Sequence, residues 1–342
     1  MPIRVGILGA GNISETHARA AAAIPDVEVV AVHGANPGRT KRLAEAFGAR
    51  AYADLETFLG HAPMEVVAIG SPSGLHAEQG ARAAAHGLHV LVEKPIDITP
   101  SRADLLIGAA ERAKVKLGVF FQDRARPDLV RTKEAIDAGR LGRPLLVSAR
   151  VRWHRPPEYY SRSRWRGTAA LDGGGALINQ GIHTVDLLLW LLGPVARVAA
   201  TSKTGLHRIE VEDTIVALLE FASGAVATLE ATTAAFPGYK RRVEISGTEG
   251  TLVIEHDRLI AADLRSAADD LVSDEAADQN ASASTPVVSD AGGHQRILED
   301  FLDAIRTNRE PRCSGREARR SVALTGAIYE AARTGAWREI DA

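Results

Sequence analysis

IRVGILGAGNIS, residues 3–14, opens the chain with an apolar run that leads into a glycine turn. Residues 3–8 predict a buried strand, and residues 12–23 predict the helix that follows it. Gly9 allows a tight turn, and Gly11 lets the backbone approach a pyrophosphate bound at the helix N-terminus. Ser14 occupies the third small-residue position of the pattern. The stretch therefore predicts a dinucleotide-binding turn, with contacts from Gly9, Gly11, Asn12 and Ile13.

Apolar strands alternate with helical patterns up to Gln122. Such alternation predicts βαβ units and a parallel sheet, and strands that are apolar throughout predict a sheet covered on both faces. We therefore predict an α/β, doubly wound Rossmann domain for NAD(P) over residues 1–122. The expected strands are 3–8, 27–32, 66–69, 88–92 and 116–120, and the expected helices are 12–23, 39–47, 75–86 and 101–113.

Beyond Gln122 several strand patterns follow one another without intervening helices. Such a run predicts an α+β domain with a mostly antiparallel sheet, here over residues 123–342. A segment rich in Ser, Asp and Ala, residues 266–293, predicts a surface excursion. The expected strands are 145–151, 195–203, 214–221, 225–232, 242–246 and 251–255, and the expected helices are 127–138, 179–192, 295–306 and 316–334.

Composition excludes several classes of partner. The 342 residues carry 41 basic and 43 acidic side chains, a formal net charge of −2, which gives no footprint for nucleic acid or for an anionic membrane. The single cysteine, Cys313, cannot form an internal disulfide, and no Cys/His spacing indicates a metal site. The N-terminal run resembles no signal peptide, and no apolar run reaches roughly 18 residues. We expect a cytoplasmic protein with a small-molecule substrate.

The end of the second strand bears on the choice of cofactor. A carboxylate there would bind the ribose 2′-hydroxyl of NAD and repel the 2′-phosphate of NADP. Residues 32–39 contain no carboxylate, and Arg39 follows Gly34 closely. This pattern favours NADP over NAD, with Gly34 and Arg39 as contacts, and leaves NAD as the alternative.

The end of the fourth strand carries the triplet Glu93-Lys94-Pro95. Ligands of open parallel sheets bind at the carboxyl ends of the strands, where this triplet is expected. The proline after Lys94 restricts the backbone and so holds the lysine in position.

The glycine turn, the run SPSGLH at 71–76 and the triplet EKP at 93–95 together resemble the Gfo/Idh/MocA oxidoreductase family, which includes glucose–fructose oxidoreductase and inositol dehydrogenase. The resemblance extends along nearly the whole chain, including the glycines at 173–175 and DFLDAI at 300–305. It implies a Rossmann domain followed by a substrate-binding domain, whose large open sheet forms a homodimer or homotetramer. It also implies hydride transfer between NAD(P) and a secondary alcohol or ketone carbon of a sugar, sugar derivative or cyclitol. By the same resemblance Lys94 is catalytic, and Ser71, Pro72, His76, Glu93, Lys94 and Gln122 contact the cofactor.

Asn179 and His183 are four residues apart at the start of a predicted helix and so share one face. Histidine suits general acid–base chemistry because its ordinary pKa is about 6.5. The family match makes His183 the acid–base group and Asn179 its neighbour in the catalytic set. Many family members carry Asp at position 179; Asn cannot carry charge, but it can hydrogen-bond a substrate hydroxyl.

The loop ahead of that helix is rich in aromatic and arginine side chains. Aromatic faces bind the C–H faces of sugar rings, and Arg and Tyr bind hydroxyl, carboxylate or phosphate groups. The alternative is a purely structural loop whose aromatic side chains pack on the sheet, since it would have the same composition. The expected substrate contacts are Arg124, Trp153, Tyr159, Trp165, Arg166, Asn179 and His183.

Two other functions remain open at this point. A glycosidase-type enzyme could use NAD for transient oxidation and release no net NAD(P)H. A regulatory protein could bind the cofactor without turnover.

Overall fold

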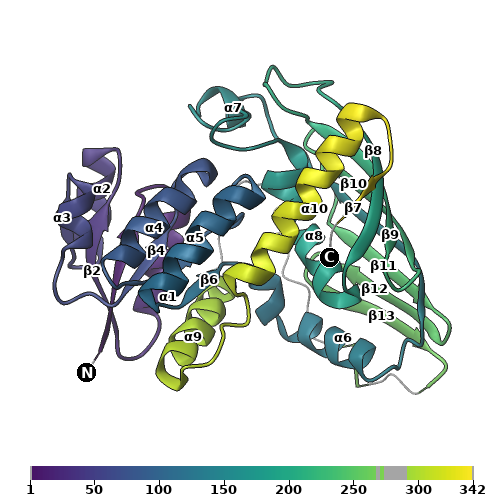
Figure 1. The fold of residues 1–342 in the computed structure, drawn as a ribbon, viewed down its shortest axis with the longest axis horizontal. Coiled ribbons are helices and arrows are strands. Elements are labelled where there is room, and N and C mark those ends of the chain that lie inside the picture. Colours follow the sequence, from purple (N-terminus) through teal and green to yellow (C-terminus); the bar gives the residue numbers. More distant parts are fainter. Residues whose placement is uncertain (1, 267–269, 273–290, 341–342) are drawn as a thin grey trace. The chain divides into compact units, whose positions relative to one another are not determined.

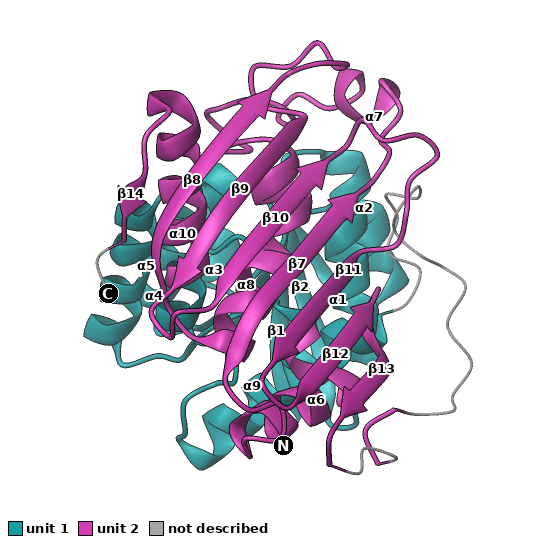
Figure 2. Ribbon diagram, turned by 90° about the vertical axis from the view of Figure 1, so that its right-hand side faces the viewer, with its two compact units in different colours: residues 1–122, 287–319 teal, residues 123–286, 320–342 magenta. Residues whose placement is uncertain are grey.

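The computed structural model describes residues 2–266, 270–272 and 291–340. The chain forms two compact units (Figure 2): unit 1 contains residues 1–122 and 287–319, and unit 2 contains residues 123–286 and 320–342. Most of the surface excursion expected at 266–293 lies outside the described residues.

Unit 1 is built on a six-stranded parallel sheet with the order β3-β2-β1-β4-β5-β6. The order reverses between β1 and β4, the topological switch point at which doubly wound sheets bind their ligands. The predicted Rossmann sheet is therefore confirmed. The strands are β1 (Ile3–Leu8), β2 (Val27–His33), β3 (Arg50–Tyr52), β4 (Val66–Ile69), β5 (His89–Val92) and β6 (Leu117–Val119).

Figure 1 shows the helices of unit 1, and some of them begin at a residue whose side chain caps the helix. The Asn36 side chain accepts a hydrogen bond from the Arg39 N–H at the start of α2, and the Thr99 side chain accepts one from Arg102 at the start of α5. Helix α4 packs against α5, and α1 packs against α9. The helices are α1 (Asn12–Ala22), α2 (Pro37–Ala46), α3 (Leu55–Leu59), α4 (His76–Ala85), α5 (Pro100–Ala113) and α9 (Gly292–Thr307).

Backbone hydrogen bonds hold the turns at the carboxyl edge of this sheet to one another. The Gly9 N–H donates to His33 O at 2.6 Å, and the Gly70 N–H donates to Leu8 O at 2.7 Å. The Glu93 N–H likewise donates to the carbonyl at the end of β4, at 2.9 Å. The glycine turn and the EKP triplet therefore lie on one edge of one sheet.

Unit 2 contains an eight-stranded sheet with the order β13-β12-β11-β7-β10-β9-β8-β14, which Figure 2 shows with its strands side by side. The pair β7–β10 is parallel, and the other described pairs are antiparallel, so the predicted mostly antiparallel sheet is confirmed. The strands are β7 (Pro144–Arg152), β8 (Val195–Lys203), β9 (Thr214–Phe221), β10 (Val226–Thr232), β11 (Arg242–Gly247), β12 (Gly250–Glu255), β13 (Arg258–Leu264) and β14 (Arg338–Glu339).

One face of this sheet forms the core of unit 2. Burial alternates along β9 and β10, and Leu229 lies opposite Ala149 on β7 and Ala217 on β9. Leu188 of α8 and Ile328 of α10 join the same apolar cluster. The helices of the second half are α6 (Pro127–Asp137), α7 (Glu158–Ser161), α8 (Ile182–Leu192) and α10 (Gly315–Thr334); α10 starts in unit 1 and continues in unit 2. Among the described helices, none combines the length and the apolar composition needed to cross a membrane.

Candidate functional site

The glycine turn after β1 has the geometry of a phosphate-binding turn. Gly9 has a φ of +122°, and a Cβ there would lie 2.4 Å from Ser14 Oγ, so no other residue fits. A Cβ on Gly11 would meet nothing within 4 Å, which leaves open space in front of the helix. No side chain caps α1, and its first-turn N–H groups, next to the exposed Asn12 and half-buried Ile13, can therefore bind an anion.

Ser14 departs from the glycine pattern, and the neighbouring strand end accommodates it. Its buried Oγ donates to Gly70 O at 3.4 Å. A Cβ on Gly70 would lie 2.9 Å from the same oxygen. The extra atoms of Ser14 thus fit because residue 70, after β4, has no side chain.

The end of β2 offers an exposed cation and no carboxylate. Gly34 packs tightly against the glycine turn, since a Cβ there would lie 2.8 Å from Ala10 Cβ. Asn36 is committed to capping α2. Arg39 is exposed and forms no ion pair with a described residue.

The segment after β4 is held by His76 rather than opened to a ligand. His76 is 1% exposed, and its ring nitrogens lie 2.8 Å from Pro95 O and 2.9 Å from Ser71 O. Burial lowers the pKa of His76, against the effect of the two carbonyls. We expected His76 to line the cofactor, but its imidazole instead ties this segment to the EKP triplet. Ser71 and Pro72 remain half-buried, and Ser71 Oγ donates to Gln79 Oε1 at 2.6 Å.

Glu93 is a buried carboxylate with three donors. Its Oε1 lies 3.0 Å from Nε2 of His17 and 3.0 Å from Nε2 of His294, and its Oε2 accepts the Lys94 N–H at 3.1 Å. Burial raises the pKa of Glu93, but hydrogen bonds and charge interactions with the two histidines outweigh it and hold the pKa well below its usual range. The carboxylate is therefore ionised and fixed, and both imidazoles present an Nε2–H to it.

These three side chains are the one group among the described residues whose ligand atoms converge enough for a metal ion, lying within 4.8 Å of one another. Hydrogen bonds account for the arrangement without an ion. His17 Nδ1 is buried without a partner among the described residues, as in a neutral ring, and burial lowers the pKa of His17. A metal-binding histidine usually donates its second nitrogen to a neighbouring acceptor, which His17 lacks.

Glu93→Gln is expected to lower the free energy of unfolding at pH 7 by about 1–3 kcal/mol, because it weakens hydrogen bonds to a buried charged group. Folding depresses the pKa values of both Glu93 and His17. Both groups therefore bind protons more readily in the unfolded chain, so the wild type loses stability as the pH falls below about 6.5 and again below about 4.3. The variant should lack the second loss.

Urea denaturation from pH 7 to about pH 3 measures this difference. Glu28→Gln, at an exposed carboxylate of β2, is the matched control and should keep the wild-type pH dependence. A Glu93→Gln variant with the same stability profile as the wild type would show that the carboxylate does not hold these elements.

Lys94 and Gln122 lie at the ends of neighbouring strands. Lys94 is half-buried and follows Glu93 directly, and the bond between Lys94 and Pro95 is cis. Gln122 lies in a short 3₁₀ turn after β6, and its buried Oε1 has no partner among the described residues. Both residues follow the carboxyl ends of their strands, the edge at which open α/β sheets bind ligands; that they contact the cofactor stays a prediction.

In unit 2 the glycine-rich segment packs against its own chain. A Cβ on Gly174 would lie 2.2 Å from the Tyr329 hydroxyl, and one on Gly175 would lie 1.7 Å from Glu212 O. The lack of side chains at these two positions is therefore explained by the close approach of Tyr329 and Glu212. The Glu212 carboxylate accepts the N–H groups of Gly175 and Leu177 and so caps the start of the next helical segment.

That segment, Ala176–Gly181, is a π-helix that leads into α8, and it carries Asn179. The Asn179 Nδ2 donates to Asp172 Oδ1 at 2.6 Å, and the other oxygen of Asp172 accepts the Gly167 N–H at 2.8 Å. Asp172 is 2% exposed. A buried carboxylate therefore lies one hydrogen bond from position 179, although residue 179 itself is neutral. Sequence reasoning missed Asp172 because no local pattern links it to Asn179.

His183 lies on the first turn of α8, half-buried, and a second carboxylate acts on it through space. Asp123 is buried, and its Oδ2 is 2.5 Å from Arg241 Nη1. Burial raises the pKa of Asp123, whereas the charges of Arg241 and His183 lower it, and the net shift is downward. Asp257, which is half-buried, is the second partner of Arg241. Asp123 carried no sequence signal as a site residue.

Arg124 is held in a buried ion pair. Its guanidinium donates to both oxygens of Asp186 at 2.8 Å, and Ser321 Oγ donates to the same carboxylate at 3.0 Å. Arg124 is 3% exposed and also lies over the Trp190 ring. The guanidinium that we expected at the substrate therefore braces α8, and Asp186 is engaged with it rather than with His183.

The loop at residues 153–166 brings its aromatic rings and two guanidiniums together. Arg155 lies 5.0 Å from the Trp153 ring centroid and 5.5 Å from that of Tyr159. Arg166 lies 4.3 Å from the Tyr159 centroid and 5.4 Å from that of Trp165. The predicted substrate contacts Trp153, Tyr159, Trp165 and Arg166 thus form one cluster, which also contains Arg155.

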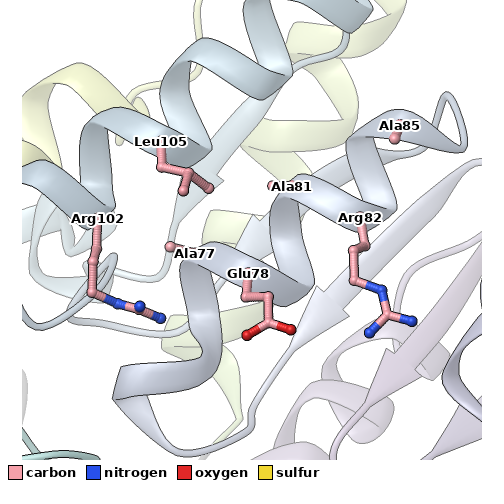
Figure 3. A pocket seen from close by; sticks show the side chains of 7 residues that line it. All are labelled: Ala77, Glu78, Ala81, Arg82, Ala85, Arg102 and Leu105. Carbon is pink, nitrogen blue, oxygen red and sulfur yellow. The ribbon is translucent and has the colours of Figure 1, made fainter.

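A hollow of 390 Å³ lies between α4 and α5 (Figure 3). The alanines of α4 and Leu105 form its apolar wall. Arg82 and Arg102 border it, but they are engaged with Glu56 and Asp97. None of the predicted site residues lines it, so we do not place the functional site there.

Two family models cover most of the chain. The model described as an oxidoreductase family with an NAD-binding Rossmann fold matches residues 3–121, and that of the GFO/IDH/MocA C-terminal domain matches residues 129–253. The chain belongs to the Gfo/Idh/MocA oxidoreductase family. It is accordingly an oxidoreductase whose unit 1 is an NAD-binding Rossmann fold.

Several similar proteins are named as dehydrogenases or reductases that act on cyclitols or sugars. Inositol 2-dehydrogenase of Rhizobium meliloti is 30% identical over 272 residues, which cover 77% of this chain and 79% of that enzyme. 1,5-Anhydro-D-fructose reductase of Ensifer adhaerens is 28% identical over 99% of this chain and 98% of that enzyme. The crystal structure of the WlbA dehydrogenase from Bordetella pertussis with NADH and UDP-GlcNAcA has a TM-score of 0.90 at 34% identity, covering 100% of this chain and 98% of that one.

Proposed function

We propose that this family member transfers a hydride between a nicotinamide cofactor and a secondary alcohol or ketone carbon of a sugar, a sugar derivative or a cyclitol. The observation that carries the proposal is that Lys94 lies on the same sheet edge as the dinucleotide turn, directly after a carboxylate fixed by two histidines. The dehydrogenase and reductase names of the relatives support the same class of reaction.

Each polar side chain has a role in this reaction. His183 accepts the hydroxyl proton during oxidation and returns it during reduction. Lys94 donates a hydrogen bond to the substrate oxygen and stabilises its developing negative charge. Asn179, oriented by Asp172, binds a neighbouring hydroxyl. The bound nicotinamide supplies the hydride acceptor or donor, and the protein supplies orientation and charge.

The lack of a carboxylate after β2 favours NADP. The Asn36 side chain caps α2. Arg39 is exposed, and no carboxylate among the described residues forms an ion pair with it, so its guanidinium can bind the 2′-phosphate of NADP. We therefore propose a higher kcat/KM with NADP than with NAD. Absorbance of the reduced nicotinamide, followed with each cofactor over a panel of sugars and cyclitols, measures this ratio.

Lys94→Ala and His183→Ala are each expected to lower kcat by about 10²–10⁴-fold, since each removes a group that moves a proton or stabilises charge in the transition state. Cofactor affinity, measured by fluorescence of the reduced nicotinamide, should stay nearly unchanged.

Unchanged turnover in both variants would contradict these roles. Loss of substrate without net NAD(P)H would instead indicate the glycosidase-type cycle. Tight cofactor binding without turnover on any member of the panel would indicate a regulatory protein.

Asp123→Asn is expected to move the acid limb of the kcat/KM–pH profile to lower pH by about 0.5–1 unit, because a nearby carboxylate favours the protonated imidazole of His183. Without that charge, His183 loses its proton at lower pH. Asp257→Asn, which also removes a carboxylate that pairs with Arg241, is the matched control. Equal shifts in both variants would mean that Asp123 has no specific effect on His183.

We also propose a homodimer or homotetramer formed through the sheet of unit 2. Its outer face carries a group of exposed apolar side chains on adjoining strands: Leu146 is 57% exposed, Leu218 49% and Val226 45%. Leu146 lies opposite Val226, and Leu218 lies opposite Thr228 on the same strand. Contiguous apolar patches of this kind mark contact surfaces.

Leu218→Glu is expected to dissociate the oligomer, because it places a charge within this apolar patch. Sedimentation velocity should show the wild type as a dimer or tetramer and the variant at a lower mass. Ile260→Glu on β13, at a site 45% exposed, is the matched control and should keep the wild-type mass. A monomeric wild type would rule out the proposed assembly.

A further inference from the structure

The aromatic loop of unit 2 holds two guanidiniums close to each other. Both lie near the ring of Tyr159, with Arg166 at 4.3 Å and Arg155 at 5.5 Å from its centroid. Burial lowers the pKa of Arg155, and the positive charge of Arg166 lowers it further. The two cations therefore repel each other in a site that is partly withdrawn from water.

No carboxylate among the described residues forms an ion pair with Arg166. Its side chain contacts the faces of Tyr159 and Trp165, and its buried Nε has no hydrogen-bond partner there. The buried acid of the neighbourhood, Asp172, accepts hydrogen bonds from Gly167 and Asn179 instead. A guanidinium held over aromatic rings with an unused donor is organised to bind an anion from outside the chain.

A row of hydrogen bonds joins this loop to Asn179. The Gln180 Nε2 donates to the Tyr159 hydroxyl at 3.2 Å and to Asn179 Oδ1 at 3.2 Å. The ring on which both guanidiniums lie is thus separated from Asn179 by a single amide nitrogen. A ligand hydroxyl at Asn179 would leave the far end of a sugar-sized ligand near Arg166.

We propose that the substrate of this enzyme is acidic, and that Arg166, with Arg155 behind it, binds its carboxylate or phosphate group while Asn179 binds a hydroxyl of the ring. This inference rests on the proposed function, since it concerns the substrate of the same site. A neutral sugar would leave the repulsion between the two cations uncompensated, whereas an anion reduces it and satisfies the Arg166 Nε.

The first experiment measures binding without turnover. Tryptophan fluorescence reports on this loop through Trp153 and Trp165, and the probes are D-glucuronate, inorganic phosphate and D-glucose. Arg166→Gln should weaken binding of the anionic probes by about 10–100-fold, the range for a lost hydrogen bond to a charged group, and leave glucose unaffected. Arg166→Lys should restore part of the affinity, because it keeps the charge but not the planar fork.

Arg164→Gln is the matched control. Arg164 is exposed on the same loop, so this change removes the same charge without altering the cluster. It should leave anion binding within about twofold of the wild type, since exposed charges at a distance are screened by salt. Relative affinities for glucuronate and phosphate distinguish a uronic acid from a sugar phosphate or nucleotide sugar.

The second experiment uses kcat/KM for matched neutral and acidic sugars: glucose with glucuronate, and glucose with glucose 6-phosphate. Acidic members should be preferred, and Arg166→Gln should raise their KM with little change in kcat. Turnover of neutral and acidic members with equal efficiency, or equal anion binding by the wild type and Arg166→Gln, overturns the inference and leaves the proposed function intact. Anion binding at Arg166 without hydride transfer on any substrate keeps the anion site and rejects the proposed function.

Discussion

The hydrogen-bonded carboxylate of Glu93 is the constraint on which unit 1 depends. It joins the end of β5 to His17 on α1 and to His294 on α9, two helices that come from opposite ends of the chain. A buried charge is tolerated only where its hydrogen bonds are satisfied, and here three donors satisfy it. Because the Lys94 N–H is one of those donors, the backbone of Lys94 is fixed by the same carboxylate that joins these elements.

The fold was predictable from the first third of the chain because its signals are local. Apolar strands, glycine turns and helix caps lie within a few residues of one another, and residues 3–14 alone define the first βα unit. The short β3 and α3 were not expected, since three and five residues are too few for a periodic pattern. The return of residues 287–319 to unit 1 also has no local signal, because it depends on contacts such as His294 with Glu93.

The candidate site was predictable residue by residue but not as a network. Lys94, Asn179 and His183 follow from motifs, and their roles stay predictions. Their supporting groups do not follow from motifs: Asp172 is seven residues from Asn179, and Asp123 is sixty positions before His183. Arg124 was expected at the substrate, and its ion pair with Asp186 had no sequence signal either; a contact between Arg124 and the substrate stays a prediction. The partner of a buried charged side chain depends on tertiary contacts, which local sequence patterns do not contain.

The neutral Asn179 illustrates what such a network does for catalysis. A carboxamide can face either way, but here its Nδ2 donates to Asp172 and its Oδ1 accepts from Gln180, so its orientation is set by its neighbours. The side chain is therefore already held in one rotamer before a ligand hydroxyl binds, so little rotamer entropy is lost on binding. The negative charge of Asp172 is thus separated from the ligand by the Asn179 side chain, whose amide it polarises. An aspartate at position 179 would repel an acidic substrate more strongly, because its charge would lie next to the ligand. A neutral residue at that position and a guanidinium at Arg166 are consistent choices for one and the same anionic ligand.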